Sequence, residues 1–90
     1  MSFVGMNLDI VKGELPKWQN LAQDLETVIT SVDTQVQEAN DAWNGPDSDK
    51  FVAEWQGQHR AQLVGAKTLV EHLTATLGHE ITEQGRVSGA

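Results

Sequence analysis

The chain has 90 residues and a formal net charge of −7, from thirteen acidic and six basic side chains. This length allows one small domain, and the excess of acids argues against a nucleic-acid backbone or an anionic membrane as partner. Cysteine is absent, which excludes a disulfide framework and thiolate chemistry. No apolar run approaches the roughly 18 residues of a membrane-spanning helix. The first six residues also lack the basic and apolar regions of a conventional secretory signal peptide. We therefore expect a protein made in the cytoplasm, which stays there or leaves by a route that reads no N-terminal signal.

Apolar side chains in the first half recur at alternating steps of three and four. This heptad spacing predicts one long amphipathic helix over about residues 8–43, with Asn7 as its N-cap. Pro16 lies inside the pattern, and we favour a helix that is kinked there but continuous. The alternative is a short helix that ends near Gly13, with Pro16 in the first turn of the main helix. The heptad positions are Leu8, Val11, Leu15, Trp18, Ala22, Leu25, Ile29, Val32, Val36, Ala39 and Trp43.

A second apolar set lies beside this stripe, at Leu21, Leu25, Val28 and Val32. The stripe is therefore wider than a contact with one other helix requires. A wide stripe is typical of a helix that faces more than one neighbour.

The strongest break in the pattern lies at mid-chain, in Trp43-Asn44-Gly45-Pro46. Gly45 can adopt a positive φ without a Cβ penalty, and Pro46 suits the first position of a new helix. Asn44 or Gly45 is the expected N-cap of that helix. Asp47 and Asp49 would fall in its first turn, where carboxylates favour the positive end of the helix dipole. We expect a turn over residues 44–46.

Helical spacing resumes after the turn and predicts a second helix over about residues 47–84. The polar side chains of Gln58, His59 and Gln62 interrupt its apolar stripe. We expect residues 85–90, which are mostly small, to be flexible, like the residues before Asn7. The apolar positions are Phe51, Val52, Trp55, Leu63, Ala66, Leu69, Val70, Leu73, Leu77 and Ile81.

Two arms of equal length joined by a tight turn predict an all-α, antiparallel two-helix hairpin that forms a single domain over residues 1–90. Folding the chain at Gly45 places Val36 opposite Trp55, Trp18 opposite Leu73 and Leu15 opposite Leu77. Such a hairpin leaves an apolar strip uncovered, and we expect it to dimerise into a four-helix bundle. The expected packing residues of hairpin and dimer are Leu15, Trp18, Leu25, Val36, Phe51, Trp55 and Leu73.

With the central Trp43-Asn44-Gly45 and its matched arms, the chain resembles the WxG family of small proteins exported by type VII secretion systems, the early-secreted-antigen-like proteins. The resemblance covers residues 7 to about 84, and Phe51 and Trp55 fit the bulky positions that follow the motif. It implies a non-enzymatic hairpin that forms a homodimer or a heterodimer with another WxG-type protein. It also implies export as a folded dimer by the type VII machinery, and hence a secreted location without a cleaved signal peptide.

One departure from the family concerns the export signal at the end of the second helix. The family usually carries Tyr-x-x-x-Asp/Glu there, whereas this chain has no tyrosine. The nearest match is His79 with Glu83, four residues apart and so on one helix face. Either His79 replaces the tyrosine, or the chain lacks its own signal. In the second case it travels with a signal-bearing partner, or acts as a cytoplasmic adaptor of a larger secreted toxin.

Enzymatic and cofactor-binding functions find no support in the sequence. There is no glycine-rich phosphate loop, and no serine lies in a nucleophile-elbow pattern. His72, His79 and Glu83 do not form a zincin pattern, and nothing near them supplies a general base in a closed pocket. We expect no catalytic residue, no metal and no cofactor.

Overall fold

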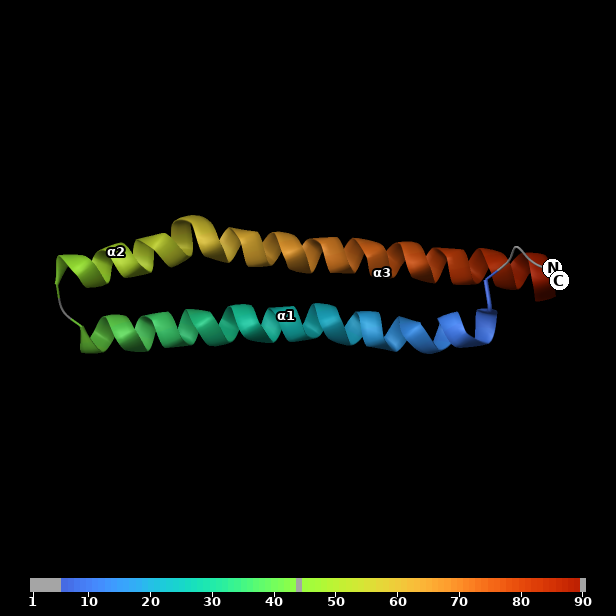
Figure 1. The fold of residues 1–90 in the computed structure, drawn as a ribbon, viewed down its shortest axis with the longest axis horizontal. Coiled ribbons are helices and arrows are strands. Elements are labelled where there is room, and N and C mark those ends of the chain that lie inside the picture. The colour runs from blue at the N-terminus through green and yellow to red at the C-terminus, as the bar shows by residue number, and fades with distance from the viewer. Residues whose placement is uncertain (1–5, 44, 90) are drawn as a thin grey trace.

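The computed structural model describes residues 6–43 and 45–89, with only the backbone of residues 87–89. The described residues are helical in two antiparallel arms, which lie side by side and reverse direction at one end (Figure 1). The first arm is helix α1, Leu8–Ala42. The second comprises helix α2, Pro46–Glu54, a π-helical turn, Trp55–His59, and helix α3, Arg60–Gly89. The predicted all-α hairpin is confirmed.

The hairpin is a thin rod with principal extents of 65 × 17 × 16 Å and a radius of gyration of 19.9 Å. A compact globule of this length would have a radius of gyration of about 12 Å. The buried side chains of the described part are few, namely Ile29, Val36, Trp55 and Ser48. The apolar core is therefore a single seam along the line where the two arms meet.

Helix α1 begins and continues as the sequence predicts. The Asn7 side chain accepts a hydrogen bond from the backbone N–H of Ile10, which satisfies one of the free donors of the first turn. The helix passes through Pro16 without a break, so the alternative of a short helix ending near Gly13 is wrong. Leu15 and Trp18, on either side of Pro16, are partly buried in the seam. Their packing offsets the hydrogen bond that the proline cannot donate.

The second arm differs from the prediction in two ways. It is not one regular α-helix, because a π-helical turn occupies residues 55–59 and appears as the wide coil between α2 and α3 (Figure 1). It also continues to Gly89, so the expected helix end near residue 84 and flexible tail from residue 85 are corrected. No proline stops this segment, and Gln84 and Gly85 are still partly covered.

The π turn also changes the pairing of the arms. An additional residue in a helical turn rotates everything beyond it by about 100°. Leu73, expected opposite Trp18, is instead exposed to solvent over about two-fifths of its surface. Leu15 lies against Gly78, at 4.0 Å from the position that a Cβ would take there. The π turn therefore decides which side of α3 faces α1.

Candidate functional site

The chain reverses direction between Ala42 and Pro46. Trp43 is the C-cap of α1, and its backbone N–H donates to the Asn40 carbonyl. Gly45 is the N-cap of α2, with φ 153° and ψ 175°, a conformation that is open almost only to glycine. Its carbonyl accepts hydrogen bonds from the N–H groups of Ser48 and Asp49, at 3.1 and 3.3 Å. Asn44, named with Trp43 and Gly45 as the motif, lies outside the described residues.

A side-chain hydrogen bond closes the reversal. Ser48 is almost completely buried, and its hydroxyl donates to the Oδ1 atom of Asn40. The bond ties the first turn of α2 to the last turn of α1. The sequence suggested only helix-end chemistry for the segment around Ser48, and its pairing with Asn40 was missed. The sequence offers one signal for this pairing, which is that both residues occupy seam positions. Asn40 follows the seam residue Ala39, and Ser48 lies four residues before the seam residue Val52.

Two aromatic side chains lie together on the surface at the reversal. The Trp43 and Phe51 ring centroids are 5.8 Å apart and the rings are tilted by 49°, a favourable geometry for an aromatic pair. Both side chains are more than one-third exposed. Asp47 and Asp49 lie in the first turn of α2 beside them, as predicted. The reversal thus presents an exposed aromatic pair with acidic neighbours.

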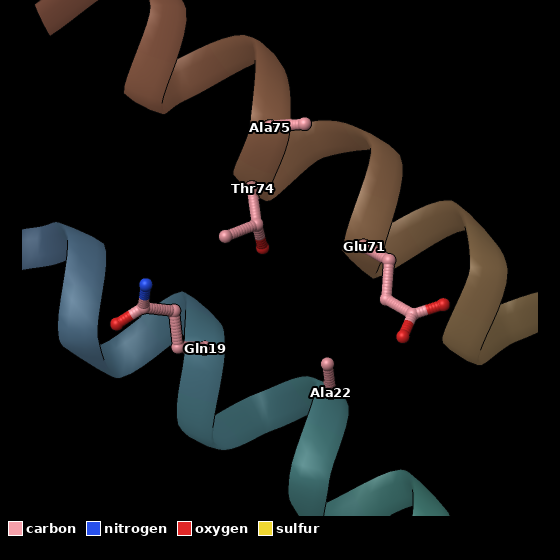
Figure 2. A pocket seen from close by; sticks show the side chains of 5 residues that line it. All are labelled: Gln19, Ala22, Glu71, Thr74 and Ala75. Atoms are coloured by element: carbon pink, nitrogen blue, oxygen red, sulfur yellow. The ribbon is translucent and has the colours of Figure 1, made fainter.

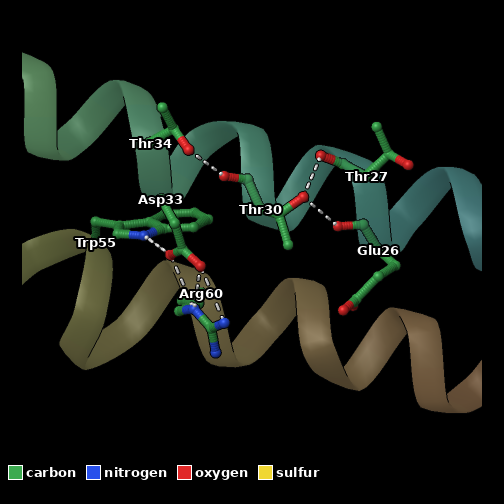
Figure 3. A network of polar contacts seen from close by, with 7 residues as sticks. All are labelled: Glu26, Thr27, Thr30, Asp33, Thr34, Trp55 and Arg60. Atoms are coloured by element: carbon green, nitrogen blue, oxygen red, sulfur yellow. Dashed lines mark hydrogen bonds and ion pairs between the residues drawn. The ribbon is translucent and has the colours of Figure 1, made fainter.

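A polar cluster connects the arms at the π turn (Figure 3). The Asp33 carboxylate of α1 accepts a hydrogen bond of 2.8 Å from the indole N–H of Trp55. The same carboxylate accepts hydrogen bonds from the Arg60 guanidinium. The Nε atom of Arg60 lies 2.9 Å from Oδ1, and Nη2 lies 3.0 Å from Oδ2. The Arg60 guanidinium, and after it the Trp55 indole, lower the pKa of Asp33 from its ordinary value. We call Asp33, Trp55 and Arg60 the clamp.

The clamp depends on the geometry of the π turn. Trp55 and Arg60 are five residues apart, and the backbone N–H of Arg60 donates to the carbonyl of Trp55. In a regular α-helix two such side chains would diverge by about 140°, whereas a wider π turn brings them to one side. The hydroxyls of Thr27, Thr30 and Thr34 beside the clamp bond only to carbonyls of their own helix (Figure 3).

One face of the hairpin is apolar and uncovered. Leu21 and Val28 of α1 are 48% and 46% exposed, and Leu69 and Leu73 of α3 are 57% and 41% exposed. The first pair is seven residues apart and the second is four apart, so each pair shares one side of its helix. We call these four residues the outward apolar face.

Both pairs emerge on the same side of the hairpin. Leu21 and Val28 lie on one side of the seam residue Ile29, and Glu26 lies on the other. On α3, Leu69 and Leu73 lie on one side of the seam residue Val70, and Lys67 lies on the other. Because the Lys67 ammonium lies 3.9 Å from a Glu26 carboxylate oxygen, the two polar sides face the same way. The two apolar sides therefore form one continuous face opposite to them.

The other expected packing residues divide between the seam and the surface. Val36 and Trp55 are buried in the seam, and Leu15, Trp18 and Leu25 are partly buried. Phe51 and Leu73 are 43% and 41% exposed, so part of each side chain is available to a partner.

At the far end of α3 the two residues of the expected export signal are near one another. His79 Nε2 lies 3.9 Å from a carboxylate oxygen of Glu83, and Arg86 approaches the same oxygen at 3.4 Å. The His79 side chain is largely exposed. The ring and the carboxylate thus lie on one side of the helix, in the half of α3 that leads away from the reversal (Figure 1).

The polar side of the hairpin carries a shallow groove of about 320 Å³. Figure 2 shows Ala22 and Thr74 pointing toward each other across it. It is open to solvent, and the side chains that line it are Gln19, Ala22, Glu71, Thr74 and Ala75. They include neither a nucleophile activated by a base nor a group of metal ligands. Within residues 6–43 and 45–89, no three acidic or histidine side chains lie close enough to hold a metal ion together. None of the helices described is both long and apolar enough to span a bilayer.

No protein-family model, curated protein or solved structure matches this chain. The candidate site therefore rests on its own geometry, which consists of the reversal with its aromatic pair, the outward apolar face and the exposed end of α3.

Proposed function

We propose that the chain is a small, non-enzymatic substrate or partner of a type VII secretion system, exported as a folded dimer of helical hairpins. The observation that carries the proposal is a reversal that bears Trp43 and Gly45 at mid-chain, between arms of matched length that leave one face apolar. This combination is the one expected from the resemblance to the WxG family.

The large accessible surface of the rod-shaped chain supports a partner. The chain exposes 6322 Å², whereas a globular monomer of the same mass exposes about 5,200 Å². The excess is about 1,100 Å² per chain, and two chains that each cover this much would bury about 2,200 Å². This is the range of permanent interfaces. A second copy or another WxG-type hairpin would each complete a four-helix bundle.

The positions of the two proposed signal elements also favour a dimer. The reversal lies at one end of the 65 Å rod, and α3 leads away from it to the other end, with His79 and Glu83 in its second half (Figure 1). One receptor could contact both elements of a single chain only by spanning most of the rod. In a bundle of two antiparallel rods, the reversal of one chain lies beside the α3 end of the other. A signal made of both elements would then be compact.

Export of variants from the native cell tests this proposal. We expect Trp43→Ala and Glu83→Ala to reduce the amount exported without lowering the amount made, because each removes one signal element. Glu71→Ala is the matched control, since it removes an exposed carboxylate of α3 outside both elements. Circular dichroism of each purified variant establishes that it is folded. Normal export of both test variants would overturn the assignment of the signal.

An alternative function is that of a cytoplasmic adaptor that pairs with the helical head of a larger secreted toxin. It is favoured by the absence of tyrosine, because the chain then lacks the Tyr-x-x-x-Asp/Glu signal that is usual in the family. Capture of the tagged chain from its native cell distinguishes the two functions. An adaptor should bring with it a large partner in stoichiometric amount and should remain in the cell.

A further inference from the structure

The second arm carries two apolar stripes that lie one residue apart. The first consists of Leu63, Val70, Leu77 and Ile81, which are partly buried and face α1. The second consists of Ala66, Leu69 and Leu73, of which the two leucines are exposed. Members of the first stripe are seven or four residues apart and members of the second are three or four apart, so each stripe keeps to one side of the helix.

The π turn decides which stripe faces α1. Before the turn, Val52 and Trp55 lie in the seam. A regular α-helix would continue their phase through residues 59, 62, 66, 69 and 73, and so through Ala66, Leu69 and Leu73. The π turn adds one residue, and the seam resumes one position later, at Arg60 and Leu63.

The chain therefore has a second possible register, in which α3 is rotated by about 100°. That register would bring Leu69 and Leu73 to the seam together with the polar side chains of His59 and Gln62. In the register observed, Leu69 and Leu73 point outward. In an uninterrupted α-helix they would face α1 and leave the surface. Rotation of α2 instead would place Asp49, Ala53 and Gln56 against α1, which is unfavourable because two of these three side chains are polar.

We propose that Asp33 is the residue that selects the register, because its carboxylate binds Trp55 and Arg60 only when the π turn places both on its side. Asp33 lies on α1, outside the turn that it holds, and makes 2.8 and 2.9 Å contacts with residues at its two ends. The clamp is thus a positioning device that keeps Leu69 and Leu73 on the outward apolar face. Register selection stands on contacts within one chain, and only its effect on dimerisation rests on the proposed function.

Cross-linking within one chain measures the register, because the chain has no cysteine of its own. Ala22 and Thr74 point toward each other across the groove (Figure 2). A chain with Ala22→Cys and Thr74→Cys should cross-link in the observed register. A chain with Ala22→Cys and Leu73→Cys should cross-link in the all-α register, where residue 73 takes the position of residue 74. Each pair of cysteines is introduced into three proteins. These are the wild type, the Asp33→Ala variant, and a variant that combines Asp33→Ala with deletion of Gly57.

We expect Asp33→Ala to lower the ratio of the 22–74 product to the 22–73 product by about tenfold, as for other two-state elements biased by one cluster. Deletion of Gly57 removes the additional residue, so a regular α-helix then keeps Leu63 and Val70 against α1. The deletion should therefore restore the wild-type ratio even without Asp33. An unchanged ratio in Asp33→Ala, loss of both products, or failure of the deletion to restore the ratio would each overturn the proposal.

Light scattering on the same proteins, without cross-linker, separates this proposal from the proposed function. If the chain dimerises through the outward apolar face, Asp33→Ala should dissociate at about tenfold higher concentration than the wild type, and the deletion should restore association. A wild-type chain that is monomeric, with cross-links that change as expected, would contradict dimerisation and leave register selection supported.

Discussion

Trp55 and Arg60 are five residues apart on the second arm, and both donate hydrogen bonds to one carboxylate on the first arm. Five residues is the spacing of a π-helical turn and not of an α-helical one. The two hydrogen bonds therefore connect the π turn to the side of α3 that faces α1.

The clamp makes stability depend on pH through Asp33. Arg60 and Trp55 lower the pKa of this carboxyl below its ordinary value of 3.8. A lowered folded-state pKa contributes stability that is complete above the unfolded-state pKa and is lost as pH falls through the folded-state pKa. We expect wild type to be more stable than Asp33→Asn at about pH 7, with a difference that shrinks below pH 3.8. Thermal unfolding of both proteins in parallel measures it. A difference that stays constant down to about pH 2 would contradict this role of Asp33.

Trp55 contributes both a donor to the clamp and apolar surface to the seam. Its side chain is buried, so Trp55→Ala should destabilise the hairpin by about 3–5 kcal/mol. Trp55→Phe keeps a six-membered aromatic ring in the seam but removes the indole N–H and part of the ring system, and we expect a smaller loss. Urea denaturation at neutral pH measures both variants. Equal losses for the two substitutions would show that packing of the ring contributes nothing beyond the hydrogen bond.

Ile29 is the most completely buried apolar side chain of the described seam. Ile29→Ala should cost about 2–5 kcal/mol, because it removes buried methyl groups and leaves a cavity between the arms. Val64→Ala is the control, since Val64 lies on α3 with more than a third of its surface exposed, and it should change stability by less than about 0.5 kcal/mol. A similar loss for both, measured by chemical denaturation, would be inconsistent with the seam described here.

Gly45 should tolerate a side chain less well than a helical glycine does. A Cβ would meet no atom within 4 Å at either Gly45 or Gly65, so space does not distinguish the two positions. At Gly45 the φ of 153° strains any other residue, and Gly45→Ala should destabilise by about 1–3 kcal/mol. Gly65→Ala, inside α3, should stabilise by about 0.5–1 kcal/mol. Melting temperatures that change in the same direction would refute the assigned turn conformation.

The sequence was sufficient to predict those parts of the fold that depend on a single type of interaction, such as burial of an apolar stripe or local helix capping. The heptad positions from Leu8 to Ala39 are all at least partly buried, because burial of an amphipathic stripe decides a long helix. Asn7, Gly45 and Pro46 were assigned from rules that depend only on neighbours in the chain, and the structure agrees with them.

The π turn could not be derived in the same way. The polar residues Gln58, His59 and Gln62 marked an interruption of the stripe, but they did not reveal that the helix would absorb one residue and continue. That outcome depends on Asp33, which is more than twenty residues away in sequence. Two apolar stripes on α3, one residue apart, left the register open to such a distant contact. The wide stripe of α1, in contrast, already indicated a further neighbour.

The mass of the purified chain in solution decides whether the chain dimerises through the outward apolar face. Light scattering over a range of concentrations should give twice the 9.9 kDa of one chain. Leu73→Glu should shift the equilibrium toward monomer, whereas Glu71→Gln, on the polar side, should not. A monomer that unfolds with poor cooperativity would indicate a different hairpin as the natural partner. A monomer at every concentration that unfolds in one cooperative transition would contradict dimerisation, because such a chain needs no partner.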